Sequence, residues 1–195
     1  WLLTKDAPKF PYPIDGAKAA RGAVVYREYC AECHGAGPRD FSGAYVGKVT
    51  DIDYIGTDRR RLDSYTYTLA VNQSTLYAGY DWRFTHFRKT FGYANMPLDG
   101  LWLRAPYLHN GSVPNLRELL EPVSNRSRVF YRGYDVYDPV NVGFVSKLDE
   151  ATAKKYFKVD TQVLGNGNAG HEGKRYGTQL GAADKDALLE FLKTF

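Results

Sequence analysis

Hydrophobic residues recur at the three- to four-residue spacing of an amphipathic helix in two stretches, one near each end of the chain. The first stretch, residues 17–29, follows Asp15, which is a suitable N-cap residue. The second, residues 182–195, has acidic residues early and Lys193 late, as the helix dipole favours. We therefore expect a helix near each end. Their apolar positions are Ala19, Ala20, Ala23, Val24 and Tyr26 in the first helix and Leu188, Leu189 and Leu192 in the second.

The long middle of the chain, residues 35–153, contains many glycines, prolines, asparagines and aspartates and shows no clean alternation of apolar and polar positions. This pattern predicts short helices and loops, among them a helix at residues 115–120. Residues 1–13 are rich in proline and aromatic residues and indicate an extended lead-in that packs on the surface, or a linker from an upstream domain. The length of 195 residues then suits one domain over residues 14–195.

A short motif, Cys30-Ala31-Glu32-Cys33-His34, ends the first predicted helix. Two thiols three residues apart, followed at once by an imidazole, form the attachment signature of c-type haem. The two cysteines bond to the haem vinyl groups as thioethers, and the adjacent histidine donates a ring nitrogen to the iron. The motif therefore predicts one covalently attached haem c, with His34 as an axial ligand.

Two other readings of the cysteine pair, half of a zinc site or a dithiol redox pair, fit less well. A zinc site needs a second pair of ligands at short spacing, but the chain has no other cysteine, and His86, His109 and His171 are scattered. A dithiol redox pair opens a helix, whereas this pair ends one. Haem attachment is the interpretation that the spacing favours.

A haem motif between two terminal helices predicts a mostly α-helical, cytochrome c-like fold with long, loop-rich insertions in the middle. In cytochrome c folds the terminal helices cross, and a glycine in the first helix lets an aromatic residue of the last helix come close. Gly22, with Phe191 or Leu188 opposite it, would fill these roles.

The charge and hydropathy of the chain restrict the cellular compartments and the classes of partner that we expect. The formal net charge of +4 is mild, and two haem propionates would offset part of it, so nucleic-acid binding is not implied. No apolar run approaches the roughly 20 residues that span a bilayer, and no signal peptide begins at Trp1. Because this kind of haem attachment takes place outside the cytoplasm, we expect a periplasmic or other extracytoplasmic protein whose export signal has been removed.

The residue opposite His34 decides the chemistry, because an occupied sixth position passes electrons whereas an open one binds oxygen or peroxide. Met96 precedes Pro97, as the sulfur ligand often does in small cytochromes c. His171 lies in a segment of glycines and asparagines, residues 165–173, that is too flexible to order itself and that an iron bond could hold. His109 lies in a turn-rich loop, and His86 has the surroundings of a packed or surface histidine. Residue chemistry alone leaves these alternatives open.

Several motifs resemble one family. They are residues 96–102 (MPLDGLW), 105–116 (APYLHNGSVPNL), 137–139 (YDP), 142–144 (VGF), 165–171 (GNGNAGH) and 184–193 (DKDALLEFLK). Together they resemble the C-terminal haem domain of bacterial dihaem cytochrome c peroxidases and, more closely, that of the rubber oxygenase-type dihaem cytochromes. The resemblance covers most of the chain. It implies that His171 is the distal iron ligand, with Met96 as the alternative.

The chain departs from that family in three places. Residues 172–175 lengthen the segment after His171, and Met96 stands where the family more often has a basic residue. The methionine of the peroxidases is also missing, since no sulfur occurs near residues 121–123. In this reading His109 has a structural or propionate-contacting role, and Arg104 or Arg117 is a candidate propionate partner.

These inferences predict a monohaem c-type cytochrome that transfers electrons to and from redox partner proteins or other haem subunits, and we assign it no catalytic residue. Its cofactor-binding residues would be Cys30, Cys33, His34 and His171, the two histidines holding the iron. One alternative is a haem peroxidase or oxygenase with an open sixth position, although the related enzymes carry two haem motifs and this chain carries one. Another is a haem-stabilised binding subunit of a larger assembly, which would display exposed aromatic side chains.

Overall fold

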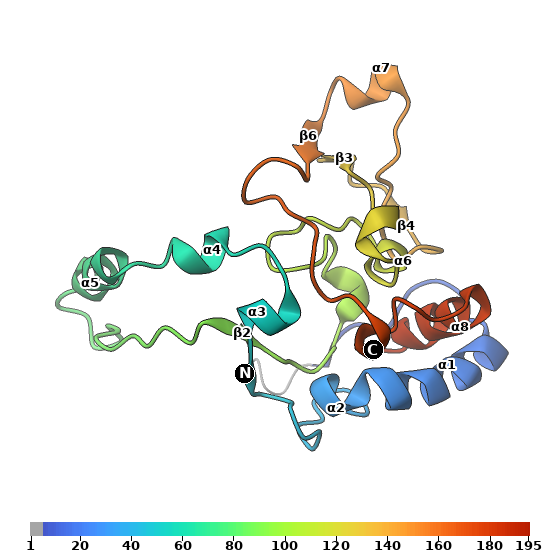
Figure 1. Cartoon of the computed structure of the whole chain (residues 1–195), viewed down its shortest axis with the longest axis horizontal. Coiled ribbons are helices and arrows are strands. Elements are labelled where there is room, and N and C mark those ends of the chain that lie inside the picture. Colours follow the sequence, from blue (N-terminus) through green and yellow to red (C-terminus); the bar gives the residue numbers. More distant parts are fainter. Residues whose placement is uncertain (1–5) are drawn as a thin grey trace.

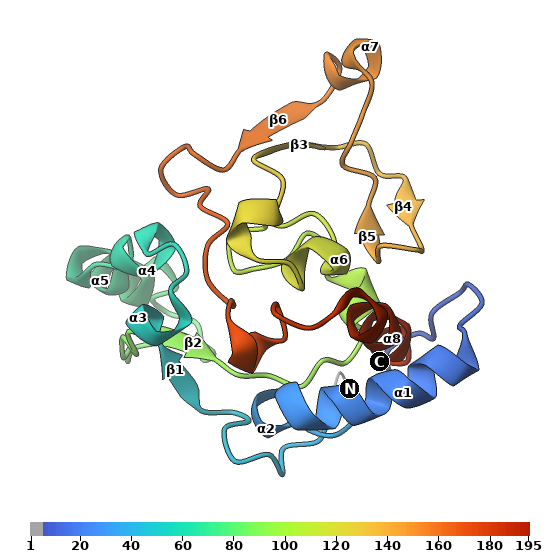
Figure 2. The same ribbon diagram turned by 45° about the vertical axis from the view of Figure 1, so that its right-hand side comes forward.

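The helices near the two chain ends pack against each other along one side of the molecule (Figures 1 and 2). The computed structural model describes residues 6–195. Helix α1 spans Gly16–Tyr29. Asp15 is its N-cap residue, and the Asp15 side chain accepts a hydrogen bond from the Lys18 amide at 3.1 Å. Helix α8 spans Ala182–Leu192. Both helices lie where the hydrophobic pattern predicted them.

Gly22 allows this close packing. A Cβ atom at Gly22 would lie 2.0 Å from the Ala187 carbonyl oxygen and 2.8 Å from the Phe191 Cβ. No larger residue fits there, so the approach of an aromatic of α8 to this glycine is present as expected, with Phe191 in that role. The Tyr26 ring packs 5.1 Å from that of Phe191, and its hydroxyl donates a hydrogen bond to the Gly35 carbonyl at 2.9 Å.

The remaining helices are short. They are α2 (Ala31–His34), α3 (Ile52–Ile55), α4 (Arg60–Asp63), α5 (Tyr67–Leu76), α6 (Leu116–Leu119) and α7 (Glu150–Ala153), with 3₁₀ turns at Leu101–Leu103, Val123–Asn125 and Lys174–Tyr176. Three antiparallel pairs of strands lie between them: β1 (Val49–Asp51) with β2 (Gly92–Ala94), β3 (Val129–Arg132) with β6 (Phe157–Asp160), and β4 (Tyr137–Asp138) with β5 (Gly143–Phe144). In the longest pair Phe130 faces Val159, and both are buried.

The prediction of a mostly α-helical fold is wrong. Helices make up 34% and strands 11% of the structure. Among the described residues, three helices are seven residues long or longer. The middle of the chain pairs strands of two to four residues, which are too short to show an alternating pattern. The longest pair, β3 with β6, joins segments that are distant in sequence, so it could not be read from either segment alone.

The described part of the N-terminal lead-in, residues 6–13, packs on the body of the molecule. Phe10 is buried and meets the Trp102 ring edge-on at 5.6 Å, and the Trp102 indole donates a hydrogen bond to the Pro8 carbonyl at 3.0 Å. Residues 1–5 of the predicted lead-in lie outside the described residues. The division into a lead-in and one domain over 14–195 stays a prediction.

A long segment that includes α5 projects away from the body, at the left of Figure 1. We call residues 65–91 the aromatic arm, because they include Tyr67, Tyr80, Trp82, Phe84 and Phe87. None of the arm's residues is buried, and Tyr67 is 86% exposed. The arm therefore has no hydrophobic core of its own.

Candidate functional site

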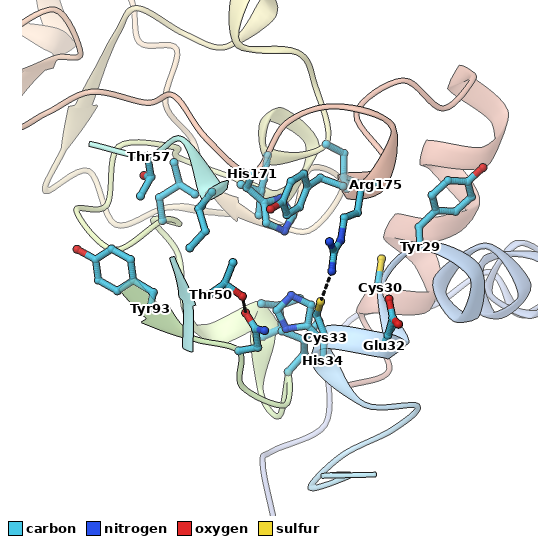
Figure 3. A pocket seen from close by; sticks show the side chains of 18 of the residues that line it. Tyr29, Cys30, Glu32, Cys33, His34, Thr50, Thr57, Tyr93, His171 and Arg175 are labelled. Atoms are coloured by element: carbon cyan, nitrogen blue, oxygen red, sulfur yellow. Dashed lines mark hydrogen bonds between the residues drawn. The ribbon is translucent and has the colours of Figure 1, made fainter. Parts of the chain in front are cut away.

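A cavity of about 680 Å³ lies between the terminal helices and the loops of the middle region (Figure 3). Its size is within the range of small-molecule and cofactor sites, which is about 300–1,000 Å³. Cys30 lies at one end and Tyr93 at the other (Figure 3). Leucines form much of its wall, namely Leu98, Leu101, Leu108, Leu116, Leu119, Leu120, Leu188 and Leu192. The cavity thus combines apolar walls with a few polar groups.

Cys30 and Cys33, at the junction of α1 and α2, both line the cavity as free thiols. Burial, and then the neighbouring Cys33, raise the pKa of the Cys30 thiol to about 12, so it is neutral. No group of three or more histidine, cysteine or acidic side chains in residues 6–195 could hold a metal ion. The donor set of a zinc site is therefore missing from the described part of the chain.

His34 ends α2, and its ring is fixed by the backbone. Its Nδ1 lies 2.8 Å from the Met96 carbonyl oxygen, which leaves Nε2 as the nitrogen available to the cavity. Metal-binding histidines commonly donate their second nitrogen to a carbonyl in this way, which sets the tautomer. Burial lowers the pKa of His34 and outweighs the opposing effect of that hydrogen bond, so the neutral imidazole is favoured.

His171 lies on the opposite wall of the cavity, facing His34 (Figure 3), with the two ring centres 6.4 Å apart. Imidazole nitrogens bind metals at about 2.0–2.1 Å, and two such bonds on opposite sides of one ion would separate the ring centres by about 6.3 Å. The Nδ1 of His171 is buried and has no hydrogen-bond partner among the described residues. Burial, followed by the nearby His34 and Arg126, lowers the pKa of His171 to about 3.

The segment that carries His171, residues 165–171, is held by side chains from elsewhere in the chain. We call it the His171 loop. Asn110 donates to the Gly165 and Gly167 carbonyls at 3.1 and 2.9 Å, and Ser112 donates to the Gly167 carbonyl at 3.0 Å. An iron bond is one way to hold this glycine-rich segment, and these hydrogen bonds hold it as well.

Arg126 is the main support of the His171 loop and was missed by the sequence analysis. The side chain is buried, with 5% of the residue exposed. Its guanidinium donates to the Asn168 carbonyl at 2.6 Å, the Gly170 carbonyl at 2.9 Å and the His171 carbonyl at 3.3 Å. Arg126 and His171 are 45 positions apart, and nothing in the sequence indicates that this arginine contacts the His171 loop.

The other candidate iron ligands lie elsewhere. The Met96 side chain is 48% exposed and does not line the cavity, and only its carbonyl group contacts His34. His86 lies in the aromatic arm, 6.1 Å from the Phe84 ring. His109 does line the cavity, where its ring stacks on Tyr93 at 4.6 Å and its Nδ1 lies 3.3 Å from the Thr57 hydroxyl. Burial lowers the pKa of His109.

The two arginines suggested as propionate partners do not line the cavity. Arg104 donates to the carbonyls of Pro97 and Asp99, and Arg117 pairs with Asp186. Arg175 takes the position at the cavity wall instead, from the segment that sequence analysis noted only as a departure from the family. Its guanidinium stacks on the Tyr54 ring at 5.1 Å and lies 3.7 Å from the Cys33 sulfur (Figure 3).

Part of the chain is similar to a known family. Residues 92–131 match the family model described as RoxA-like, cytochrome c-like, which confirms the resemblance predicted from the motifs. A cytochrome c-like domain implies haem c as its cofactor. The two thiols, the two facing neutral imidazoles and the leucine walls fit that group.

Two curated relatives come from Sinorhizobium fredii. The uncharacterized protein y4iM is 32% identical over 228 residues, which cover 95% of this chain and 50% of that protein. The uncharacterized protein y4iJ is 43% identical over 108 residues, which cover 52% of this chain and 17% of that protein. The chain therefore spans at most about half the length of these relatives.

Proposed function

We propose that this chain, which carries a RoxA-like, cytochrome c-like domain, is a monohaem electron-transfer module in which His34 and His171 are the two axial iron ligands. The observation that carries the proposal is the pair of imidazole rings that face each other across the cavity at 6.4 Å. That spacing agrees with the value of about 6.3 Å for two imidazoles on opposite sides of one metal ion.

The bound haem would supply a one-electron iron couple. Around it, Cys30 and Cys33 form the covalent tether, and the Met96 carbonyl orients His34. The His171 loop presents His171 from the other wall, and the leucine walls exclude water. His171 is favoured over Met96 because the methionine is half exposed and does not line the cavity.

Two aspects of this function, its cellular compartment and its partners, are inferred from the family and from the class of reaction. We propose a periplasmic or other extracytoplasmic location, because haem attachment of this type takes place there. No helix in residues 6–195 is long and apolar enough to span a membrane. Its partners would be redox proteins or other haem subunits. The activity of any longer protein of this type would depend on regions beyond this domain, since the chain covers half of y4iM.

A spectroscopic redox titration of the protein matured with its haem tests the ligand pair. Two histidines predict a low-spin iron in both oxidation states, no sulfur-to-iron charge-transfer band, and a lower potential than histidine–methionine ligation gives. A clearly positive potential together with that band would establish Met96 as the ligand and overturn the proposal.

The enzyme alternative requires an open sixth position on the iron. It predicts that the reduced protein binds carbon monoxide, and the oxidised protein cyanide, at ordinary concentrations. Two axial histidines predict slow or negligible binding of both. Rapid and complete binding by the unmodified protein would favour a peroxidase or oxygenase over an electron carrier.

A specific observation favours the second alternative, a haem-stabilised binding subunit: in the aromatic arm Tyr67, Trp82 and Phe84 are each exposed by 61% or more. Large exposed aromatic surfaces mark interaction sites in soluble proteins. In this case the native particle would be larger than the 22.0 kDa chain, and replacing Trp82 and Phe84 by serine would reduce it to that mass. Light scattering on the purified protein and on protein in native extracts measures this directly.

A further inference from the structure

Arg126 is a buried cation whose five hydrogen bonds all go to backbone carbonyl oxygens. Besides the three in the His171 loop, its guanidinium donates to the Glu121 carbonyl at 3.1 Å and to the Leu119 carbonyl at 3.2 Å. It thereby joins the end of α6 to the loop that carries His171. A planar guanidinium with five N–H donors suits this task, whereas a lysine ammonium has three donors at a single point.

The charge of Arg126 is not cancelled by a carboxylate in direct contact. Within residues 6–195 Arg126 forms no ion pair, and the acidic groups whose charges act on it are Glu172 and Glu118. Both carboxylates are engaged elsewhere: Glu118 accepts hydrogen bonds from the Ser127 amide and hydroxyl, each at 2.8 Å, and Glu172 accepts one from the Val123 amide at 2.8 Å. A positive charge is therefore held in a poorly solvated place behind His171.

A fixed positive charge near a redox centre stabilises the form of that centre with less positive charge, which is the reduced form. The effect is strongest where water is excluded, as it is around a residue that is 5% exposed. It works against the low potential expected of two histidines. A lysine in place of the arginine would keep the charge but lose most of the geometry, which makes the two contributions separable.

We propose that Arg126 is a positioning residue with two roles: its hydrogen bonds fix the direction of His171, and its charge raises the reduction potential of the haem iron. The proposal rests on the proposed function, in which His171 is the distal ligand. It adds a residue that does not line the cavity and that acts through the loop and through its charge.

The test compares Arg126→Gln, Arg126→Lys and the control Arg128→Gln in the haem-loaded protein. Arg128 lies two positions away, with 64% of its side chain exposed and a loose contact of 3.9 Å to Asp160. We expect Arg126→Gln to lower the ratio of reduced to oxidised protein at fixed ambient potential by about tenfold, which equals about 59 mV for one electron. Arg128→Gln should change that ratio less than twofold.

Arg126→Lys separates the roles. It should keep most of the potential but increase the fraction of high-spin iron and the rate of carbon monoxide binding, because the loop is held by fewer hydrogen bonds. Ser112→Ala removes the 3.0 Å bond to the Gly167 carbonyl without a change of charge, and should loosen ligation in the same way with little shift in potential. It also keeps the comparison available if Arg126→Gln does not fold.

The outcomes distinguish the two proposals. If the unmodified protein lacks a bis-histidine spectrum, the proposed function fails before Arg126 is considered. If that spectrum is present and Arg126→Gln leaves the potential unchanged, the role of the charge is wrong. If both Arg126→Lys and Ser112→Ala bind carbon monoxide as slowly as the unmodified protein, the positioning role is wrong.

Discussion

The composition of the His171 loop suggests a flexible segment and that of the aromatic arm a buried one, and the structure shows the opposite for both. The loop contains three glycines and two asparagines in seven residues, which is typical of a flexible segment, yet Asn168 and Gly170 are buried. The arm contains eight aromatic residues in 27, which is typical of a core, yet none of its residues is buried. Local composition is therefore a poor guide to order in this protein.

The difference lies in the partners that each segment finds. The loop receives hydrogen bonds from Asn110, Ser112 and Arg126, which come from two other parts of the chain. The arm's contacts are mostly local, such as the Tyr77 and Trp82 rings at 4.7 Å and the Arg83 side chain on the Ser74 carbonyl at 2.5 Å. Hydrogen bonds from distant parts of the chain order the glycine-rich His171 loop. The exposed aromatic rings of the arm contribute little to its order.

The largest effect is expected from a matched pair of histidines. His171→Ala should remove one axial ligand, so that the reduced protein binds carbon monoxide rapidly and the oxidised protein becomes largely high-spin. His86→Ala, in the arm, should leave the absorption spectrum unchanged. Stopped-flow mixing with carbon monoxide measures both. Equal behaviour of the two variants would remove His171 from the iron site.

A matched pair of glycines tests the packing of the loop. Gly170 and Gly79 have similar positive φ angles of 90° and 92°, so the backbone strain of an alanine is similar at both. A Cβ at Gly170 would lie 2.7 Å from the Thr57 backbone, whereas a Cβ at Gly79 meets nothing within 4 Å. We expect Gly170→Ala to lower the free energy of unfolding by about 1–3 kcal/mol more than Gly79→Ala, by chemical denaturation.

Hydrogen exchange compares the backbone of the two segments directly. The His171 amide donates to the Ile55 carbonyl at 3.1 Å inside a packed region, so it should exchange slowly. The amides of residues 77–91 should exchange with opening free energies near zero, since they are exposed and make few backbone hydrogen bonds. Protection of residues 77–91 in the isolated protein would show that the arm is covered in solution, for example by a second copy.

The smallest effects are expected at Trp82 and Met96. Trp82→Ser removes a ring that is 61% exposed and should change the free energy of unfolding by no more than about 0.5 kcal/mol. Met96→Leu keeps the carbonyl that orients His34 and should leave the spectrum and the potential as they are. A large change in potential in Met96→Leu would instead support the methionine as ligand.

The terminal helices and their contact were predictable because each depends on nearby residues. The periodic apolar positions and the Asp15 cap define α1, and Gly22 leaves room for the close approach of α8. The pairing of β3 with β6 was not predictable, because the two strands are short and their paired residues lie 25 or more positions apart. Arg104 and Arg117 were suggested as propionate partners from the chemistry of arginine. In the structure Arg104 donates to the Pro97 carbonyl and Arg117 pairs with the Asp186 carboxylate.

The sequence by itself determined the haem attachment motif, because the chemistry of Cys30, Cys33 and His34 depends on spacing within five residues. It also reduced the distal ligand to a few candidates. Only the tertiary structure brought His171 to 6.4 Å from His34, left Met96 out of the cavity wall and buried Arg126 behind the loop. These placements depend on hydrogen bonds between segments that are far apart along the chain, and such bonds leave no periodic or local signal in the sequence.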